Sequence, residues 1–134
     1  MQIKRIFKFG ITGGIGTITN LVLFFIFVDI LKLNHNIVNV CCFFVACTQN
    51  YIINHLWTFK HENNDTKLSF KLWSKFVIVS LLGLAVNLLV MNFLLHLCGW
   101  KYLVVPQCVG IMAGMLLNYL MSNLIVFRRN TNDE

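Results

Sequence analysis

Four of the asparagines inside the long apolar stretches of this chain lie at matching positions. Asn20 and Asn87 occupy the middle of two such stretches, and Asn50 and Asn118 lie closer to the ends of two others. An amide is costly in hydrocarbon, so these side chains are expected to face the protein interior. Two roles stay open for them: a polar groove that binds a ligand, or hydrogen bonds that hold helices together.

The asparagines recur at a fixed spacing. Asn20 and Asn87 are 67 residues apart, and Asn50 and Asn118 are 68 apart. The residues that recur with the first offset are Lys4, Lys8, Phe9, Gly16 and Leu21, which match Lys71, Lys75, Phe76, Gly83 and Leu88. A duplicated intramembrane Asn indicates a pathway at a repeat interface. We therefore expect one domain over 1–134, with repeat one at about 4–60 and repeat two at about 71–128.

The elements that position these side chains are predicted from charge. Four stretches contain no Asp, Glu, Lys or Arg: 9–28, 37–59, 76–98 and 103–127. Each is long enough, as a helix, to cross roughly 30 Å of hydrocarbon. The predicted fold class is an all-α membrane protein whose four transmembrane helices form two parallel two-helix repeats.

The basic residues predict the orientation. Nine Lys and Arg residues lie in the N-terminal segment, the central loop and the tail, whereas the two short hairpins carry only Lys32 and Lys101. This bias predicts a multi-pass protein of the cytoplasmic membrane with both termini and the central loop in the cytoplasm. Since each repeat has an even number of spans, both copies then point the same way.

Two local patterns predict packing and interfacial contacts. Lys67, Lys71 and Lys75 follow one another at four-residue spacing beside apolar residues, which predicts an amphipathic interfacial helix that runs into the third span. The pairs Gly10/Gly14 and Gly110/Gly114 have the spacing of close helix contacts, and each is expected to seat a different neighbour.

Donor groups gather at the predicted cytoplasmic mouth of the spans. The residues expected to bind a substrate there are Asn54, His55, Lys8, Lys75, Lys60 and Arg128, together with the four asparagines above. The acid closest to a span, Asp29, lies at an outer end, so the electrostatic field favours an anion such as a phosphate over a cation.

Catalytic chemistry is not expected. The spans contain no carboxylate pair, no nucleophile–base pair and no metal-ligand spacing. We expect no enzymatic activity, no metal and no cofactor. The expected surroundings are the lipid bilayer, with no nucleic acid, and the sequence leaves open whether the chain forms a homo-oligomer.

These motifs resemble the GtrA-like family of small four-span membrane proteins. The similarity rests on Gly-x-x-x-Asn at Gly16/Asn20 and Gly83/Asn87 and on the run Asn-Tyr-Ile-Ile-Asn-His-Leu-Trp-Thr-Phe at 50–59, and it covers about residues 5–129. This chain departs from the family pattern at His55, where an Arg is usual, and at Ile125, in the position of a Trp.

The resemblance implies a role in surface glycosylation. It implies translocation of a polyprenyl-phosphate-linked monosaccharide, such as undecaprenyl-phosphate glucose, across the cytoplasmic membrane, for a cell-surface polysaccharide or teichoic acid. A membrane glycosyltransferase that loads the lipid carrier is the implied partner. The alternative is a non-transporting adaptor that anchors or regulates that glycosyltransferase. The sugar, the acceptor polymer and the energy source are left open.

Overall fold

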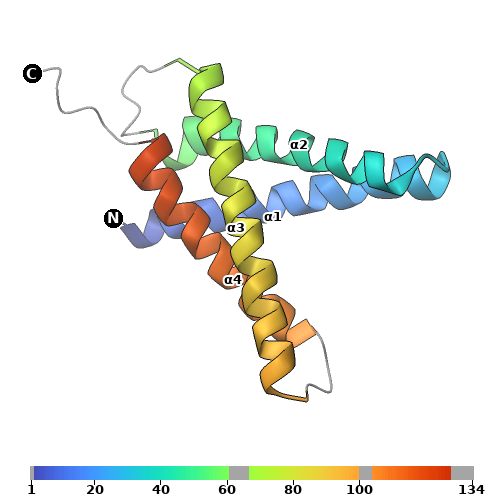
Figure 1. Ribbon diagram of the computed structural model, residues 1–134. Coiled ribbons are helices and arrows are strands. Elements are labelled where there is room, and N and C mark those ends of the chain that lie inside the picture. Colours follow the sequence, from blue (N-terminus) through green and yellow to red (C-terminus); the bar gives the residue numbers. More distant parts are fainter. Residues whose placement is uncertain (1, 61–66, 100–103, 128–134) are drawn as a thin grey trace, which may run out of the picture. The chain divides into compact units, whose positions relative to one another are not determined.

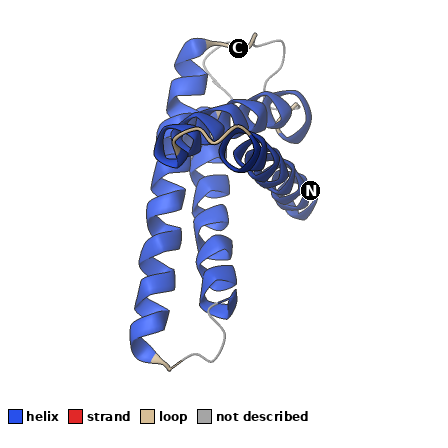
Figure 2. Ribbon diagram, turned by 90° about the vertical axis from the view of Figure 1, so that its right-hand side faces the viewer, coloured by secondary structure: helices blue, strands red, loops and turns tan. Residues whose placement is uncertain are grey.

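All regular structure in the described residues is helical. The computed structural model describes residues 2–60, 67–99 and 104–127, and no strand occurs in these ranges (Figures 1 and 2). The chain divides into two compact units, Met1–Trp73 and Ser74–Glu134. A backbone that folds into helices satisfies its own hydrogen bonds, which a chain in hydrocarbon requires.

Unit 1 is a helical hairpin. Its elements are α1 (Gln2–Phe24), the π-helical turn η1 (Phe25–Ile30), α2 (His35–Ile53) and the π-helical turn η2 (Asn54–Thr58). The connection between η1 and α2 is only four residues long, so α1 and α2 lie antiparallel and side by side (Figure 1). Asn34 caps the N-terminus of α2, because its Oδ1 accepts a hydrogen bond from the Ile37 N–H at 3.3 Å.

Two helices build unit 2, and the first of them begins at the end of unit 1. They are α3 (Phe70–Leu97) and α4 (Val104–Met121), and α4 continues into the π-helical turn η3 (Ser122–Val126). The predicted interfacial helix corresponds to the beginning of α3. The prediction that this helix includes Lys67 is wrong, since α3 begins at Phe70. The reason is a cap: Ser69 Oγ accepts a hydrogen bond from the Leu72 N–H at 3.1 Å.

α2 and α4 end in the same way. The Phe59 N–H donates to the Asn54 carbonyl at 2.9 Å, and the Phe127 N–H donates to the Ser122 carbonyl at 2.9 Å. Both phenylalanines are buried. The Phe59 ring lies 6.3 Å from the Phe9 ring, and the Phe127 ring lies 6.2 Å from the Phe76 ring. Each hairpin is therefore closed at this end by one aromatic pair.

The apolar surface of the helices shows that the chain is a multi-pass membrane protein. Three segments of the described residues are long and apolar enough to cross a bilayer: Gln2–Ile30, Phe70–Leu97 and Val109–Val126. α2 is a fourth helix of the described residues. Large apolar side chains such as Phe7 and Leu89 are exposed by 70% and 69%, which suits a surface in contact with lipid.

Candidate functional site

A cation and an aromatic ring meet where α1 passes η2 in unit 1. The Lys8 Nζ lies 5.2 Å from the centre of the Trp57 ring, within the range of a cation–π interaction. One turn further along α1, the buried Thr12 donates its hydroxyl hydrogen to the Lys8 carbonyl at 3.0 Å. The ammonium group is thus held beside the end of α2 instead of extending freely from the helix.

η2 buries a polar wall next to this cation. Asn54 is 1% exposed, and its Oδ1 accepts a hydrogen bond from the Thr58 hydroxyl at 2.7 Å. His55 is 4% exposed, and its ring lies 5.8 Å from that of Tyr51. Because π-helical turns are rare and frequently occur at functional sites, this turn with its buried polar side chains is a place to seek a ligand in unit 1.

Asn50 lies on α2 about one turn before Asn54 and packs against a glycine of α1. A Cβ added at Gly16 would lie 2.5 Å from the Asn50 Nδ2, so only glycine leaves room for the amide there. The Asn50 Oδ1 is buried and accepts no hydrogen bond from the described residues. A buried acceptor without a donor is costly, and a ligand hydroxyl would remove that cost.

A similar contact occurs within unit 2. A Cβ added at Gly83 of α3 would lie 3.2 Å from the Asn118 Cβ on α4. The Asn118 Oδ1, however, is occupied, because it accepts a hydrogen bond from the Ser122 hydroxyl at 3.3 Å. The two glycine–asparagine contacts therefore share their packing and differ in the state of the amide.

In unit 2, the Asn87 side chain resembles that of Asn50 in having an amide oxygen without a hydrogen-bond partner among the described residues. Its Oδ1 is buried and accepts no hydrogen bond within the described residues, and it lies 2.6 Å from the position of a Cβ added at Gly110.

Gly110 and Gly114 of α4 lie closely against α3, as predicted. Gly14 differs: it is exposed and a Cβ added there meets nothing within 4 Å, so the expectation that it seats a neighbour within the chain is wrong.

The remaining predicted residues are more dispersed. Asn20 is half-buried on α1, Lys75 is half-buried on α3, and Lys60 is exposed just beyond η2. Arg128 lies outside the described residues. Lys8, Asn50, Asn54 and His55 thus belong to unit 1, while Lys75, Asn87 and Asn118 belong to unit 2.

Three residues of this site were not among the predicted ligands. The Thr12 hydroxyl donates a hydrogen bond to the Lys8 carbonyl, and the Thr58 hydroxyl donates one to the Asn54 Oδ1. The Trp57 ring forms the cation–π contact with the Lys8 ammonium group. Thr12 and Thr58 each lie four residues after the residue that they contact. That spacing places both on one helical face and was the signal available in the sequence.

The charges around the described site have one sign. Lys8, Lys60 and the N-terminal Lys4 and Arg5 lie in unit 1, and the one carboxylate among the described residues is Asp29, exposed on η1 at the opposite end of α1. Such a site attracts anions and offers amide oxygens to hydroxyl groups.

Comparison with known proteins identifies the kind of domain. A family model described as GtrA/DPMS, transmembrane domain, matches residues 8–127, which is nearly the whole chain. Among curated protein sequences, none matches.

Proposed function

Because the chain belongs to the GtrA/DPMS transmembrane domain family, whose members are membrane proteins linked to glycosylation, we propose that it translocates a polyprenyl-phosphate-linked monosaccharide across the cytoplasmic membrane. The sugar would then reach a cell-surface polysaccharide or teichoic acid. A membrane glycosyltransferase loads the carrier in this scheme, and the chain itself catalyses no reaction.

The proposed architecture has four spans in two repeats that point the same way, with both termini in the cytoplasm. Matching local contacts support it. Phe9 pairs with Phe59 as Phe76 pairs with Phe127, and both partners of one pair lie 67 or 68 residues before those of the other. α2 and α4 also end in π-helical turns at the same offset. With even numbers of spans, such repeats are related by an axis along the membrane normal.

The phosphate is assigned to the Lys8 end of unit 1. A lipid phosphate needs charge-assisted donors and a position near the polar interface. Lys8 supplies the charge, Trp57 restricts where that charge lies, and Lys60 follows η2 nearby in the sequence. The ring of Trp57 is also the amphipathic kind that prefers the membrane interface.

The observation that carries the proposal is the pair of unpartnered amide oxygens. Asn50 Oδ1 and Asn87 Oδ1 are both buried without a hydrogen-bond donor among the described residues. Structural hydrogen bonds would have occupied them, as the hydroxyl groups of Thr58 and Ser122, each one turn later on the same helical segment, occupy the oxygens of Asn54 and Asn118. Sugar hydroxyls are donors that would satisfy such acceptors during passage.

The test is transport by the purified protein. Undecaprenyl-phosphate glucose would be incorporated into both leaflets of liposomes, and periodate, which does not cross the bilayer, would be added outside to oxidise the exposed sugar. We expect the protein to make the inner-leaflet sugar accessible, whereas protein-free liposomes protect it. Protection that persists with folded protein, together with loss of surface glycosylation when the gene is deleted, would instead support the adaptor.

A further inference from the structure

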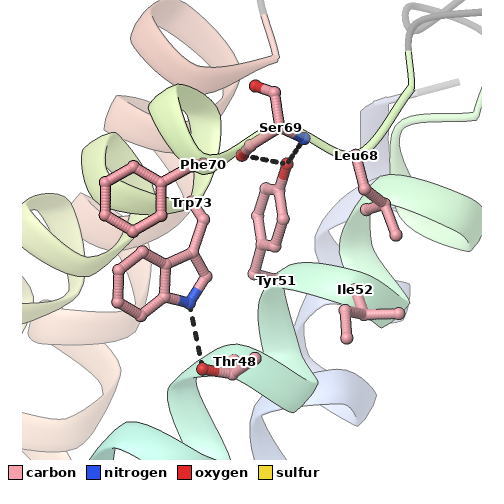
Figure 3. A pocket seen from close by; sticks show the side chains of 7 residues that line it. All are labelled: Thr48, Tyr51, Ile52, Leu68, Ser69, Phe70 and Trp73. Carbon is pink, nitrogen blue, oxygen red and sulfur yellow. Dashed lines mark hydrogen bonds between the residues drawn. The ribbon is translucent and has the colours of Figure 1, made fainter.

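Unit 1 contains a pocket that none of the predicted ligands lines. Its volume is about 420 Å³, within the usual range for small-molecule sites. The lining residues come from α2, from the two residues just before α3 and from the first turn of α3: Thr48, Tyr51, Ile52, Leu68, Ser69, Phe70 and Trp73. Figure 3 shows Tyr51 in the middle of the pocket lining. Phe70 and Trp73 lie on one side of it, and Ile52 and Leu68 lie on the other side.

The polar groups of this pocket are already satisfied by one another. Tyr51 donates its phenolic hydrogen to the Ser69 carbonyl and accepts from the Ser69 N–H, both at 3.3 Å. The Trp73 indole N–H donates to the Thr48 hydroxyl oxygen at 2.9 Å, and that hydroxyl donates to the Phe44 carbonyl at 2.7 Å. The pocket therefore offers carbon surface to an occupant, which suits a hydrocarbon and not a sugar.

Tyr51 connects this apolar pocket to the polar site. Its ring forms part of the pocket wall and also lies 5.8 Å from the ring of His55 in η2. Lys67 and Lys71 are exposed, and each is next in the sequence to a lining residue, Leu68 and Phe70 respectively. A molecule that fits both neighbouring environments has an anionic head and a hydrocarbon chain.

We propose that this pocket holds the isoprene units next to the phosphate of the lipid-linked sugar. The inference rests on the proposed function and adds a tail-binding site to it. While the head occupies the site of Lys8 and His55, the chain leaves it past Tyr51 into the pocket. The aromatic rings of Phe70 and Trp73 then cover the chain and remove it from the surrounding lipid.

The experiment compares two ligands that share a head group. Undecaprenyl-phosphate glucose has the full chain, and citronellyl-phosphate glucose has the same head on a much shorter chain. Binding of both would be measured with the full-length protein in nanodiscs of neutral lipid. Leu68→Trp and Ile52→Phe fill the pocket from two different segments of the chain, and Leu56→Trp is the matched control because Leu56 is exposed and lies outside the lining.

We expect the wild type and Leu56→Trp to bind the long-chain ligand more tightly than the short one. Each filling variant should lose several-fold in affinity for the long-chain ligand, because the chain loses its packing contacts with the pocket walls, and should bind the short one as before. Unchanged short-chain binding also shows that the filled variants are folded. The tail site would be overturned, while head-group binding stands, if the wild type bound both ligands with equal affinity. It would also be overturned if both filling variants lost affinity equally for the two ligands. No binding of either ligand to the wild type would overturn the proposed function as well.

Discussion

The Lys8 ammonium group lies 5.2 Å from the centre of the Trp57 ring, so a charge near the start of α1 is fixed by an aromatic residue in the turn that ends α2. A cation–π contact at a partly exposed site contributes about 0.5–1 kcal/mol. Trp57 is 40% exposed, which places this contact in that range. In the proposed function, this contact would restrict the positions that the ammonium group can adopt before a phosphate arrives.

The first prediction concerns this pair. Lys8→Gln should weaken binding of undecaprenyl-phosphate glucose about tenfold or more, because a hydrogen bond to a charged group contributes about 1.5–3 kcal/mol. Trp57→Leu should weaken it by a few-fold, since the charge remains but is no longer held. Affinity would be measured in nanodiscs of neutral lipid, with Lys4→Gln as the control for loss of a charge on the same helix. Affinities that match the control in both variants would exclude Lys8 as a phosphate ligand.

A second prediction separates packing from ligand binding at two glycines. Gly114→Ala should lower the thermal stability of the detergent-solubilised protein, because the added Cβ meets the backbone carbonyl of Gly83, which cannot rotate away. Gly16→Ala should affect stability less, since the atoms that it meets belong to the end of the Asn50 side chain. It should instead displace that amide and reduce transport.

The control for both glycine variants is Gly14→Ala. No atom lies within 4 Å of the added Cβ there, and alanine favours a helix over glycine by about 1 kcal/mol, so stability should be unchanged or higher. A larger loss of stability for Gly16→Ala than for Gly114→Ala would contradict the packing described at these two sites.

The third prediction concerns the asparagines of α3 and η2. Asn87→Leu should leave the amount of folded protein nearly unchanged, because the Asn87 Oδ1 has no hydrogen bond to lose within the described structure, but it should abolish delivery of the sugar. Asn54→Leu should reduce the folded fraction, because the Thr58 hydroxyl loses its acceptor inside the protein. Protein extracted in mild detergent and surface glycosylation would be measured in the same cells.

A matched control for Asn87→Leu is present on the same helix. Asn92 is exposed and donates only to the Leu88 carbonyl of its own helix, so Asn92→Leu should change neither readout. If Asn87→Leu and Asn92→Leu transport the sugar equally well, the Asn87 amide has no part in the pathway. The same measurement on Asn20→Leu asks whether the corresponding residue of α1 acts alike.

The fourth prediction is the orientation of the chain. Labels at residue 64 and at the C-terminus should react from the cytoplasm, and a label at residue 35 should react from outside, because the basic residues are concentrated in the first two regions. A cysteine-accessibility map with a membrane-impermeant thiol reagent measures this directly, with the native cysteines replaced beforehand. A central loop that reacts from outside would move the Lys8 end of unit 1 to the wrong side for loading by a cytoplasmic glycosyltransferase.

Much of the fold follows from the sequence alone. The absence of charge over long stretches predicts the helices, because hydrocarbon allows few other backbone structures, and the family similarity predicted from the asparagine motifs is confirmed by the match over residues 8–127. The repeat offset also indicated which glycines and asparagines correspond. These are local or periodic properties, which sequence reports directly.

The tertiary structure decided how each of these residues is used. Three asparagines that look alike in the sequence differ in their partners: Asn118 accepts from Ser122, whereas the Asn50 and Asn87 oxygens receive nothing from the described residues. Similarly, Gly110 and Gly114 contact α3 while Gly14 remains exposed. Whether a donor lies within reach depends on which face of a helix meets its neighbour and on the rotation of that neighbour. These are properties of packing in space, and residue spacing along one helix does not determine them.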